Sequence, residues 1–378
     1  MVIPSLPWEM ECEILSRVPP TSVKRLQLTC KRWYALFKDQ RFINNHLRKS
    51  ETQMVLLNDE SVYSFSFNFH GINNWYGRFI DCTGKLKSLK YSEKVKVSEI
   101  FHCEGLLLCT TTDNSLVVWN PCTGQTRWIQ SRQSSNRYTK YKYFLGYENE
   151  NKSRDSLKIL ELSYNLGVWK FEIYEFNSDS WRVLDTDSVN FGILSSLGVS
   201  LKGNTYWLVY DLVSFILRFD FTTERFGHLS LPRQSDDDYD AGVVLSVVRE
   251  EKLALLFQNS ARSSQVKIWV TNTKADETKY FSWSEFSFST VCLTRVMSFL
   301  VDEENKWVLL CHQDYIDQER TIISVAGENI YGTVVYKDCK ETHYDRSRQR
   351  PSSLLLSYVP SLVQIPAKQS TPGGKRKS

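Results

Sequence analysis

From about residue 50 onward, the sequence is built of short runs of β-branched and aromatic residues that alternate with polar residues. These runs lack the 3.6-residue period of a long helix and favour β-strands instead. We therefore expect the larger part of the chain to be all-β. The clearest runs are Leu106–Cys109, Leu116–Trp119, Leu157–Leu162, Trp169–Phe176, Thr205–Tyr210, Ile216–Phe221, Lys252–Phe257, Val266–Val270, Trp307–Cys311 and Ile330–Tyr336.

A loose repeat runs through this β-region. An apolar run ends in a turn rich in Asn, Asp, Thr, Ser or Gly, and an aromatic or apolar residue follows. With one turn residue as the marker of each copy, the intervals are 39, 57, 43 and 52 residues. Blades of kelch-type propellers repeat every ~50 residues. The repeat predicts a propeller of undetermined blade number, with an irregular β-sandwich or barrel as the alternative. The markers are Asp81, Asn120, Asn177, Asp220 and Asn272.

Residues 5–48 have a helical pattern instead. Apolar residues of the first stretch recur mainly at steps of four, which is typical of one face of an amphipathic helix. Pro19 and Pro20 end this stretch, because proline lacks the N–H donor and restricts the residue before it. The apolar residues of this first face are Met10, Ile14, Leu15 and Val18.

A second apolar stripe follows the prolines at steps of three and four, and Thr21 and Ser22 are candidates for its N-cap. The stripe fits one helix or two closely joined helices. A further short helix is expected from Asp39 to Lys49. The stripe consists of Val23, Leu26, Cys30, Trp33 and Phe37, and the opposite face carries Lys24, Lys31 and Lys38.

Charge is distributed unevenly along the chain. Residues 1–50 carry a net charge of +5, residues 51–366 a net charge of −5, and residues 367–378 a net charge of +4. The mildly acidic β-region has no basic footprint of the kind that binds nucleic acid. Residues 363–378 hold a Pro-Gly-Gly sequence and a basic cluster, so we expect them to form a disordered tail.

The sequence shows neither a secretory signal nor a membrane-spanning segment. The first residues lack the basic region of a secretory signal, and no uncharged apolar run approaches the ~18 residues of a membrane span. We therefore expect a protein of the nucleus or cytoplasm that has no membrane contact. In that setting its nine cysteines, none of them in a CxxC pair, are expected to be reduced thiols.

Motifs of known catalytic chemistry are not found. The sequence has no HExxH, GxSxG, GxGxxG or EF-hand pattern, and its six histidines are scattered. We therefore expect no catalytic residue, no metal and no cofactor. Aromatic residues in loops are the better candidates for contacting a partner, because Tyr and Trp are typical interface anchors. These candidates are Trp75, Tyr76, Tyr138 and Tyr239, together with Tyr141 and Tyr143.

The N-terminal pattern resembles a known family. The sequence LPWEMECEILSRVP, from Leu6 to Pro19, is followed by Ser22–Leu26, Thr29–Trp33 and Phe42 at the spacing of an F-box. The β-region resembles the type 1 F-box-associated interaction domain of the large plant F-box family. The segments that carry this second resemblance are His102–Cys109, Val118–Gly124, Gly146–Tyr147, Lys170–Tyr174, Gly203–Trp207 and Phe219–Phe226.

The resemblance implies an α+β multidomain chain. A small helical F-box would occupy residues 1–48, a β-rich, kelch-like propeller domain residues 49–362, and the basic tail residues 363–378. Its implied function is that of the substrate-recognition subunit of an SCF-type (Skp–cullin–F-box) ubiquitin ligase. Through a Skp-type adaptor the F-box would reach cullin and RING subunits, while the β-domain captures an unknown target protein for ubiquitylation and degradation.

On this interpretation the chain is a receptor and not an enzyme. The alternative is a binding module for a glycan or a protein that acts outside ubiquitylation. Nine positions are implied by the resemblance to meet the adaptor, the last three of them shared with the core of the F-box itself. They are Leu6, Pro7, Ile14, Leu15, Val18, Pro19, Leu26, Cys30 and Trp33.

Overall fold

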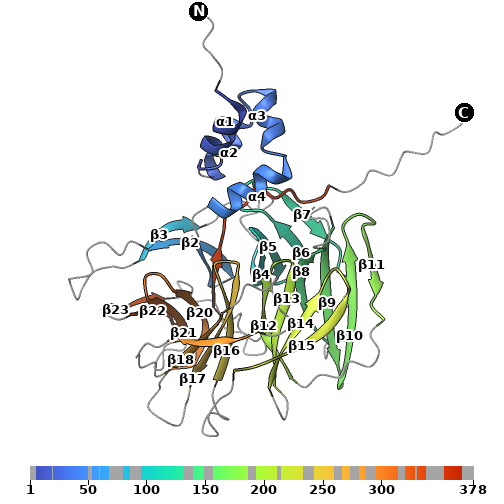
Figure 1. Ribbon diagram of the computed structural model, residues 1–378. Coiled ribbons are helices and arrows are strands. Elements are labelled where there is room, and N and C mark those ends of the chain that lie inside the picture. The colour runs from blue at the N-terminus through green and yellow to red at the C-terminus, as the bar shows by residue number, and fades with distance from the viewer. Residues whose placement is uncertain are drawn as a thin grey trace, which may run out of the picture.

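The structure is a computed structural model in which a small helical module precedes a six-bladed β-propeller (Figure 1). The described residues are 6–18, 20–49, 53–58, 60–67, 80–85, 95–131, 139–148, 156–185, 193–210, 214–232, 242–258, 266–272, 281–286, 294–313, 320–327, 330–337 and 353–367. The helices of the module are α1 (Trp8–Leu15), α2 (Pro20–Leu26), α3 (Lys31–Leu36) and α4 (Gln40–Lys49).

Each blade is a four-stranded antiparallel sheet, which confirms the predicted propeller and excludes the sandwich or barrel. Ordered from the axis outward, blade 1 contains β24 (Leu354–Tyr358), β1 (Gln53–Asn58), β2 (Ser61–Phe67) and β3 (Ile80–Lys85). Blade 2 contains β4 (Val97–Cys103), β5 (Leu106–Thr111), β6 (Leu116–Trp119) and β7 (Thr126–Ile129). Blade 3 contains β8 (Lys140–Tyr147), β9 (Leu157–Asn165), β10 (Val168–Glu175) and β11 (Ser180–Val183).

The other three blades repeat this order. Blade 4 contains β12 (Ile193–Leu201), β13 (Asn204–Tyr210), β14 (Phe215–Asp220) and β15 (Arg225–Ser230). Blade 5 contains β16 (Gly242–Val248), β17 (Lys252–Gln258), β18 (Val266–Thr271) and β19 (Trp283–Phe286). Blade 6 contains β20 (Val296–Asp302), β21 (Trp307–Gln313), β22 (Arg320–Gly327) and β23 (Ile330–Lys337).

The ring is closed by the last strand of the chain. In blade 1, β24 pairs with β1 in antiparallel register, so that Leu354 lies opposite Leu57 and Tyr358 opposite Gln53. The first strand of every other blade comes from the same stretch of sequence as its partners, but here the two ends of the β-region meet. An unclosed sheet would leave the inner edge of β1 without hydrogen-bond partners, which the pairing with β24 prevents.

Small polar residues of the inner strands hold neighbouring blades together. Ser246 Oγ on β16 donates to the carbonyl of Phe299 on β20 at 2.7 Å, and Ser298 Oγ on β20 accepts from the amide of Leu355 on β24 at 2.9 Å. The inner strands enclose a cavity of about 120 Å³ on the axis. That volume lies well below the ~300–1,000 Å³ of a typical small-molecule site, so the axis is largely filled.

The helical module has a buried core, which is continuous with that of the propeller, and side chains cap the starts of α3 and α4. Val23 and Phe37 are fully buried, and the rings of Phe37 and Phe42 meet edge to face at 5.3 Å. The predicted second stripe divides into α2 and α3, because Cys30 is extended and its Sγ accepts from the amide of Trp33. The predicted third helix is confirmed as α4, whose first amides are capped by the carboxylate of Asp39.

The chain beyond β24 forms a strap that lies across blade 2 and beside α4 (Figure 1). We define this strap as residues 359–367. Asn120, which is fully buried, donates from Nδ2 to the carbonyls of Ser361 at 3.0 Å and Val363 at 2.8 Å. Arg127 donates to the carbonyl of Pro366 at 2.6 Å. One hydrophobic cluster contains Leu362, Val363 and Ile365 of the strap, Leu15 and Phe42 of the helical module, and Leu106 and Leu108 of blade 2.

The strap corrects the predicted boundary of the tail. Residues 363–367 were expected to be disordered, but Val363 is 4% and Ile365 8% exposed. The segment lies close enough to blade 2 that Gly105, at φ +82°, has no room for a side chain: a Cβ there would lie 2.2 Å from that of Ser361. Residues 368–378, with the basic cluster, lie outside the described residues.

The repeat markers also have a common place in the fold, with one exception. Asn120, Asn177, Asp220 and Asn272 each lie at or just after the end of the third strand of a blade. At Asp220, the side chain accepts from the amides of Thr222 and Thr223, as an Asx-type turn requires. The prediction for Asp81 was wrong, because this residue lies inside β3.

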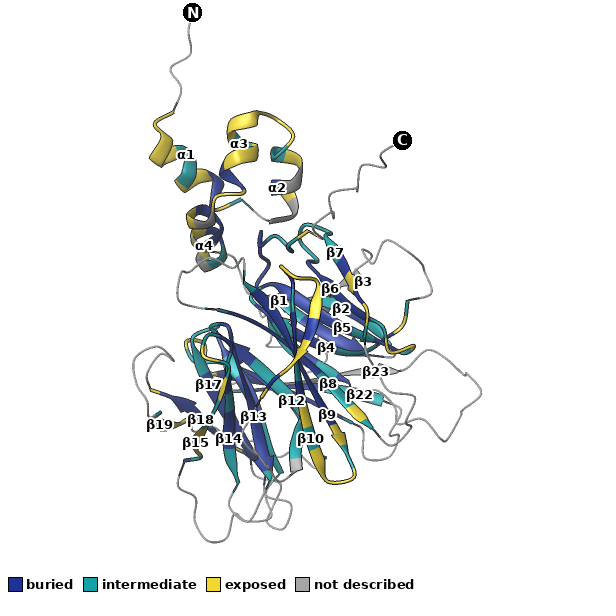
Figure 2. Ribbon diagram, turned by 90° about the vertical axis from the view of Figure 1, so that its right-hand side faces the viewer, coloured by how far each residue is buried: buried dark blue, intermediate teal, exposed yellow. Residues whose placement is uncertain are grey.

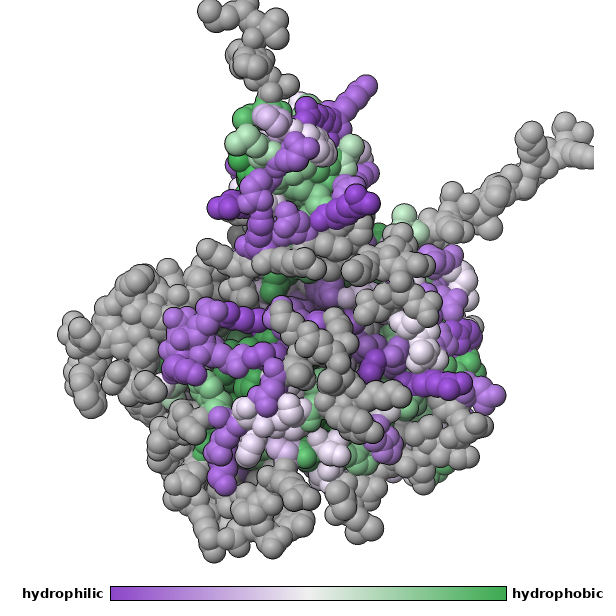
Figure 3. Space-filling view, in the orientation of Figure 1, coloured by the Kyte–Doolittle hydropathy of each residue, from purple (hydrophilic) through white to green (hydrophobic). Residues whose placement is uncertain are grey.

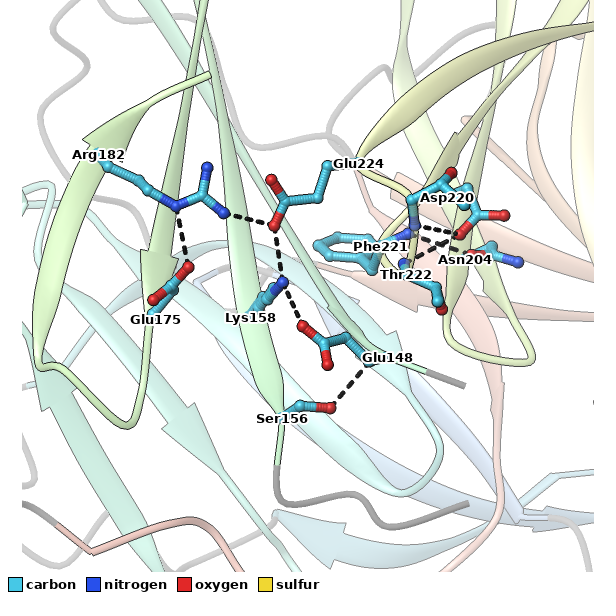
Figure 4. A network of polar contacts seen from close by, with 11 residues as sticks. Glu148, Ser156, Lys158, Glu175, Arg182, Asn204, Asp220, Phe221, Thr222 and Glu224 are labelled. Atoms are coloured by element: carbon cyan, nitrogen blue, oxygen red, sulfur yellow. Dashed lines mark hydrogen bonds and ion pairs between the residues drawn. The ribbon is translucent and has the colours of Figure 1, made fainter. Parts of the chain in front are cut away.

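An ion-pair network joins blades 3 and 4 on the face that carries the strap (Figure 4). The ammonium of Lys158, whose side chain is 9% exposed, lies 2.7 Å from Glu224 and 2.5 Å from Glu148. Arg182 binds Glu224 as well and pairs with Glu175 at 2.9 Å. Burial alone would raise the pKa of Glu224, but the hydrogen bonds from Arg182 and Lys158 outweigh it and lower that pKa below 4.5.

Replacing Asn120 by Asp should release the strap while preserving the turn. The carboxylate still accepts from the turn amides of Cys122 and Thr123, but it has no donor for the strap carbonyls and repels them. We expect Asn120→Asp to lower the free energy of unfolding by about 2 kcal/mol in urea titrations. The matched variant Asp220→Asn, in a turn that holds no strap, should lower it by less than about 1 kcal/mol. Equal losses would contradict the role of the strap.

The network predicts a loss of stability in acid. Because the pKa of Glu224 is lowered on folding, its contribution is fully present above pH 4.5 and is lost as the pH falls through the lowered value. Glu224→Gln should therefore destabilise the protein by about 1–2 kcal/mol at pH 7 and flatten the stability profile below pH 4.5. Glu304→Gln, at the exposed pair with Arg249, should leave the dependence of stability on pH unchanged. Thermal unfolding at a series of pH values measures both variants.

Candidate protein-interaction surfaces

The first helix and the residues before it present an apolar surface to solvent (Figures 2 and 3). Leu6 is 53%, Met10 56% and Ile14 53% exposed, and Trp8 is 44% exposed. Met10 and Ile14 are four residues apart and therefore lie on the same side of α1. We call these four residues, together with Pro7, the α1 surface. Since the module already has a buried core, these side chains are surplus to its folding and are available to a partner.

The predicted adaptor-contacting residues divide between this surface and the interior. Leu6, Pro7, Ile14 and Cys30 are exposed, while Val18, Leu26 and Trp33 are half-buried against the core of the module. Leu15 is only 4% exposed and packs inside, so it supports the helices and does not belong to the exposed surface. Pro19 lies outside the described residues.

Trp33 and Arg32 tie α3 to α1 through one carboxylate. Glu11 accepts from the indole N–H of Trp33 and pairs with Arg32 at 2.6 Å. The Arg32 guanidinium also lies over the ring of Trp8, 4.7 Å from its centroid. The half-buried indole is therefore fixed by a hydrogen bond that runs between helices. Sequence reasoning missed Trp8 as a surface residue, although its position directly after Leu6-Pro7 could have indicated it.

Positive charge surrounds the apolar side chains of the module. Arg25, Lys31 and Lys38 are exposed, and Arg17 keeps 73% of its side chain exposed although it pairs with Glu13. Hydrogen bonds from Lys49 and Arg17 lower the pKa of Glu13, so this carboxylate stays ionised and compensates part of that charge. Glu9 and Glu13 are exposed on α1 as well, so the module presents apolar side chains among charges of both signs with a basic excess, which suits an acidic partner mainly by accelerating association.

The propeller has a second face whose position follows from strand order. In a four-stranded meander, turns between second and third strands and connections between blades lie at one end, and the other turns lie at the opposite end. The strap and the entry from α4 into β1 lie at the end with the first-to-second and third-to-fourth turns. We call the opposite end, with the second-to-third turns and the connections between blades, the distal face. Figure 2 shows the β9–β10 turn at the opposite side of the propeller from the helices.

The predicted loop aromatics map partly onto that distal face. Trp75, Tyr76, Tyr138 and Tyr239 lie outside the described residues. The strand ends that flank Tyr138 and Tyr239, in the pairs β7/β8 and β15/β16, open on the distal face, whereas β2 and β3, which flank Trp75 and Tyr76, are the third and fourth strands of blade 1 and open on the face that carries the helices. Tyr141 and Tyr143 are not loop residues. Both lie on β8, where Tyr143 is 6% exposed and Tyr141 is half-buried.

His102, a polar residue near the axis, makes its contacts within the protein. His102 Nε2 accepts from the amide of Gly105 at 2.9 Å, and Nδ1 lies 3.4 Å from Glu250. Burial lowers the pKa of His102 to about 4, so the ring is neutral near pH 7. Among the described residues, no group of three or more His, Cys, Asp or Glu side chains is placed to hold a metal ion. None of the described helices is both long and apolar enough to span a membrane.

A hollow of about 620 Å³ between β7 and β11 is the feature most relevant to the alternative of glycan binding. Trp128, 44% exposed, lines it together with Asp179. The Asp179 carboxylate accepts from Arg127 at 2.8 Å and also from the hydroxyl of Tyr174. It is therefore engaged within the protein, and the polar side chains left to line the hollow are uncharged, among them Gln130, Ser131 and Ser180.

Alanine substitutions should distinguish the buried residues of α1 from its exposed ones. Leu15→Ala removes a buried side chain and should lower the free energy of unfolding by about 2–4 kcal/mol. Ile14→Ala, at the neighbouring exposed position, should lower it by less than about 1 kcal/mol. Thermal or urea unfolding of the full chain measures both. An Ile14→Ala loss as large as that of Leu15→Ala would place Ile14 in the core.

Comparison with known proteins agrees with both parts of the structure. An F-box domain model matches residues 3–45, and a model described as F-box associated beta propeller domain matches residues 53–365. An F-box/kelch-repeat protein of Arabidopsis thaliana is 50% identical over 388 residues, covering 98% of this chain and 99% of the relative. Another from the same plant is 44% identical over 387 residues, covering 97% and 96%.

Among solved structures, an oligogalacturonate lyase in complex with manganese matches 70% of this chain and 67% of its own, with a TM-score of 0.38 and 6% identity. That similarity is too distant to bear on chemistry. The two family models and the relatives are decisive: the chain belongs to the F-box proteins that carry an F-box associated β-propeller domain.

Proposed function

We propose that this chain is the substrate-recognition subunit of an SCF-type ubiquitin ligase. The observation that carries the proposal is the α1 surface, an apolar surface on a module whose own core is already complete. In the F-box family this module binds a Skp-type adaptor. These four large apolar side chains are exposed to water in the free chain, so burying them on an adaptor would stabilise the complex through the hydrophobic effect.

The chain would then promote ubiquitylation by placement. Cullin and RING subunits, recruited through the adaptor, would bring an activated ubiquitin, and the propeller would hold a target protein nearby. Proximity of this kind raises the effective concentration of the target lysines without any acid, base or nucleophile from the receptor. The strap supports the proposal, because a module fixed to the propeller keeps the target at a defined distance from the ligase.

The α1 surface can be tested by binding of the purified full chain to a plant Skp-type adaptor. Leu6→Ala/Ile14→Ala shortens two exposed side chains and should weaken binding by well over tenfold, since interface anchors typically contribute about 2 kcal/mol each. Isothermal titration calorimetry gives the affinity, and circular dichroism confirms that the variant is folded.

The matched control is Val183→Ala, which shortens an apolar side chain of similar exposure on β11 of the propeller. It should leave adaptor affinity unchanged. Equal affinity of the wild type and the Leu6→Ala/Ile14→Ala variant would rule out the α1 surface as the docking site. A folded wild-type chain that does not bind the adaptor at all would rule out the ligase function.

A further inference from the structure

The β9–β10 hairpin of blade 3 exposes apolar side chains at its tip. Outside the helical module, five large apolar residues are exposed among the described residues, and three of them belong to this hairpin. Leu166 is 87%, Val168 57% and Tyr164 36% exposed. Tyr164 also packs against Trp169 across the two strands, with ring centroids 4.7 Å apart. The tip therefore combines two free aliphatic side chains with a supported aromatic pair.

The backbone of the tip is unfavourable for the residue it carries. Leu166 has φ +48° and Gly167 φ +87°, as in a two-residue turn that normally prefers Asn-Gly. A bulky residue pays roughly 1–2 kcal/mol in this left-handed region. The other nine non-glycine residues with positive φ among the described residues are all polar or charged. Leucine at this position serves neither the turn nor the core, which points to a role outside the chain.

Lysines surround the tip. Lys140 lies on β8 opposite Tyr164, and Lys170 follows Val168 on β10 by two residues. Both are exposed, and neither forms an ion pair with a described residue. The strand ends 139–142 and 163–171 contain no acidic residue. A partner that buried the apolar tip would therefore gain by placing carboxylates beside these two ammonium groups.

We propose that the β9–β10 hairpin is a docking element for a target protein, and that it binds a segment with apolar side chains flanked by Asp or Glu. This inference rests on the proposed function and names the kind of target. The hairpin lies on the distal face, away from the helical module, so a bound target leaves the α1 surface free for the adaptor (Figure 2).

A displayed library of random 16-residue peptides, selected on the immobilised full chain, provides the probe. We expect the enriched peptides to combine aliphatic or aromatic residues with Asp and Glu. Leu166→Asn should weaken their binding at least tenfold, and Lys140→Glu/Lys170→Glu should do the same. Exchanging Asp and Glu of a selected peptide for Lys should restore its binding to the Lys140→Glu/Lys170→Glu chain. Val183→Ser, at an exposed apolar site elsewhere on blade 3, should have no effect.

Stability gives an independent readout. Asn tolerates the left-handed conformation better than Leu, so Leu166→Asn should raise the thermal midpoint by about 1–2 °C while it weakens peptide binding. A lower midpoint would show that Leu166 contributes to the fold and would overturn the proposal. Selected peptides that bind the Leu166→Asn chain as well as the wild type would overturn it too.

Two further outcomes separate this proposal from others. Vesicles with 30% phosphatidylserine, offered in place of peptides, should not bind; binding that Leu166→Asn abolishes would identify a membrane-inserting tip instead. Adaptor affinity, measured on the same preparations, should be unchanged by all the hairpin variants. Loss of peptide selection with intact adaptor binding would reject the hairpin alone, whereas a wild-type chain that fails to bind adaptor would reject the ligase function.

Discussion

The structure depends on the pairing of β24 with β1. This single pairing joins residues near position 55 to residues near position 356 and turns six separate sheets into a ring. The loop-closure entropy of so long a segment grows only slowly with length, so the five residue pairs of the β24–β1 ladder and the buried Leu355 and Tyr358 can offset it. Without the pairing, blade 1 would lack its inner strand and the inner edge of β1 would be open.

Closure also decides where the two interaction surfaces lie. The chain enters β1 from α4 and leaves β24 as the strap, so both connections emerge at the same end of the ring. The strap then packs under the helical module through Leu362, Val363 and Ile365. The helices are consequently fixed to one face, and the β9–β10 hairpin is directed to the other. Under the proposed function the receptor would need this separation, because it would bind the adaptor and the target at once.

Sequence reasoning identified the second and third strands of the blades far better than the others. β5, β6, β13 and β17 were predicted within one or two residues of their ends, because nearly all of their residues are buried and read as apolar runs. The first strands carry Ser, Lys and Glu toward the axis, as at Ser98, Glu99 and Lys142, and so lose that signal. Most fourth strands are only four to six residues long, too short for a pattern to stand out.

The same limits apply to the surfaces. Among the residues that the F-box spacing implies as adaptor contacts, Leu6, Pro7 and Ile14 are exposed, but Leu15, one position further, faces the core. Consecutive residues of a helix point about 100° apart. The spacing of the family motif does not tell which of two neighbours, such as Ile14 and Leu15, is exposed. Residues 363–367 of the strap were assigned to the tail because only two of them, Val363 and Ile365, are buried and because they lie near a Pro-Gly-Gly sequence. The hairpin at Leu166 was missed because Leu-Gly does not have the Asn-Gly signature of a tight turn.

Hydrogen exchange of β24 tests directly whether the last strand closes the ring and anchors the strap. We expect the amides of β24 to be protected as strongly as those of β9 in the middle of blade 3, and both strands to exchange only when the whole propeller unfolds. If β24 exchanged many times faster than β9 while the other blades stayed protected, the ring would be open in solution and the closure would not be what holds the structure together.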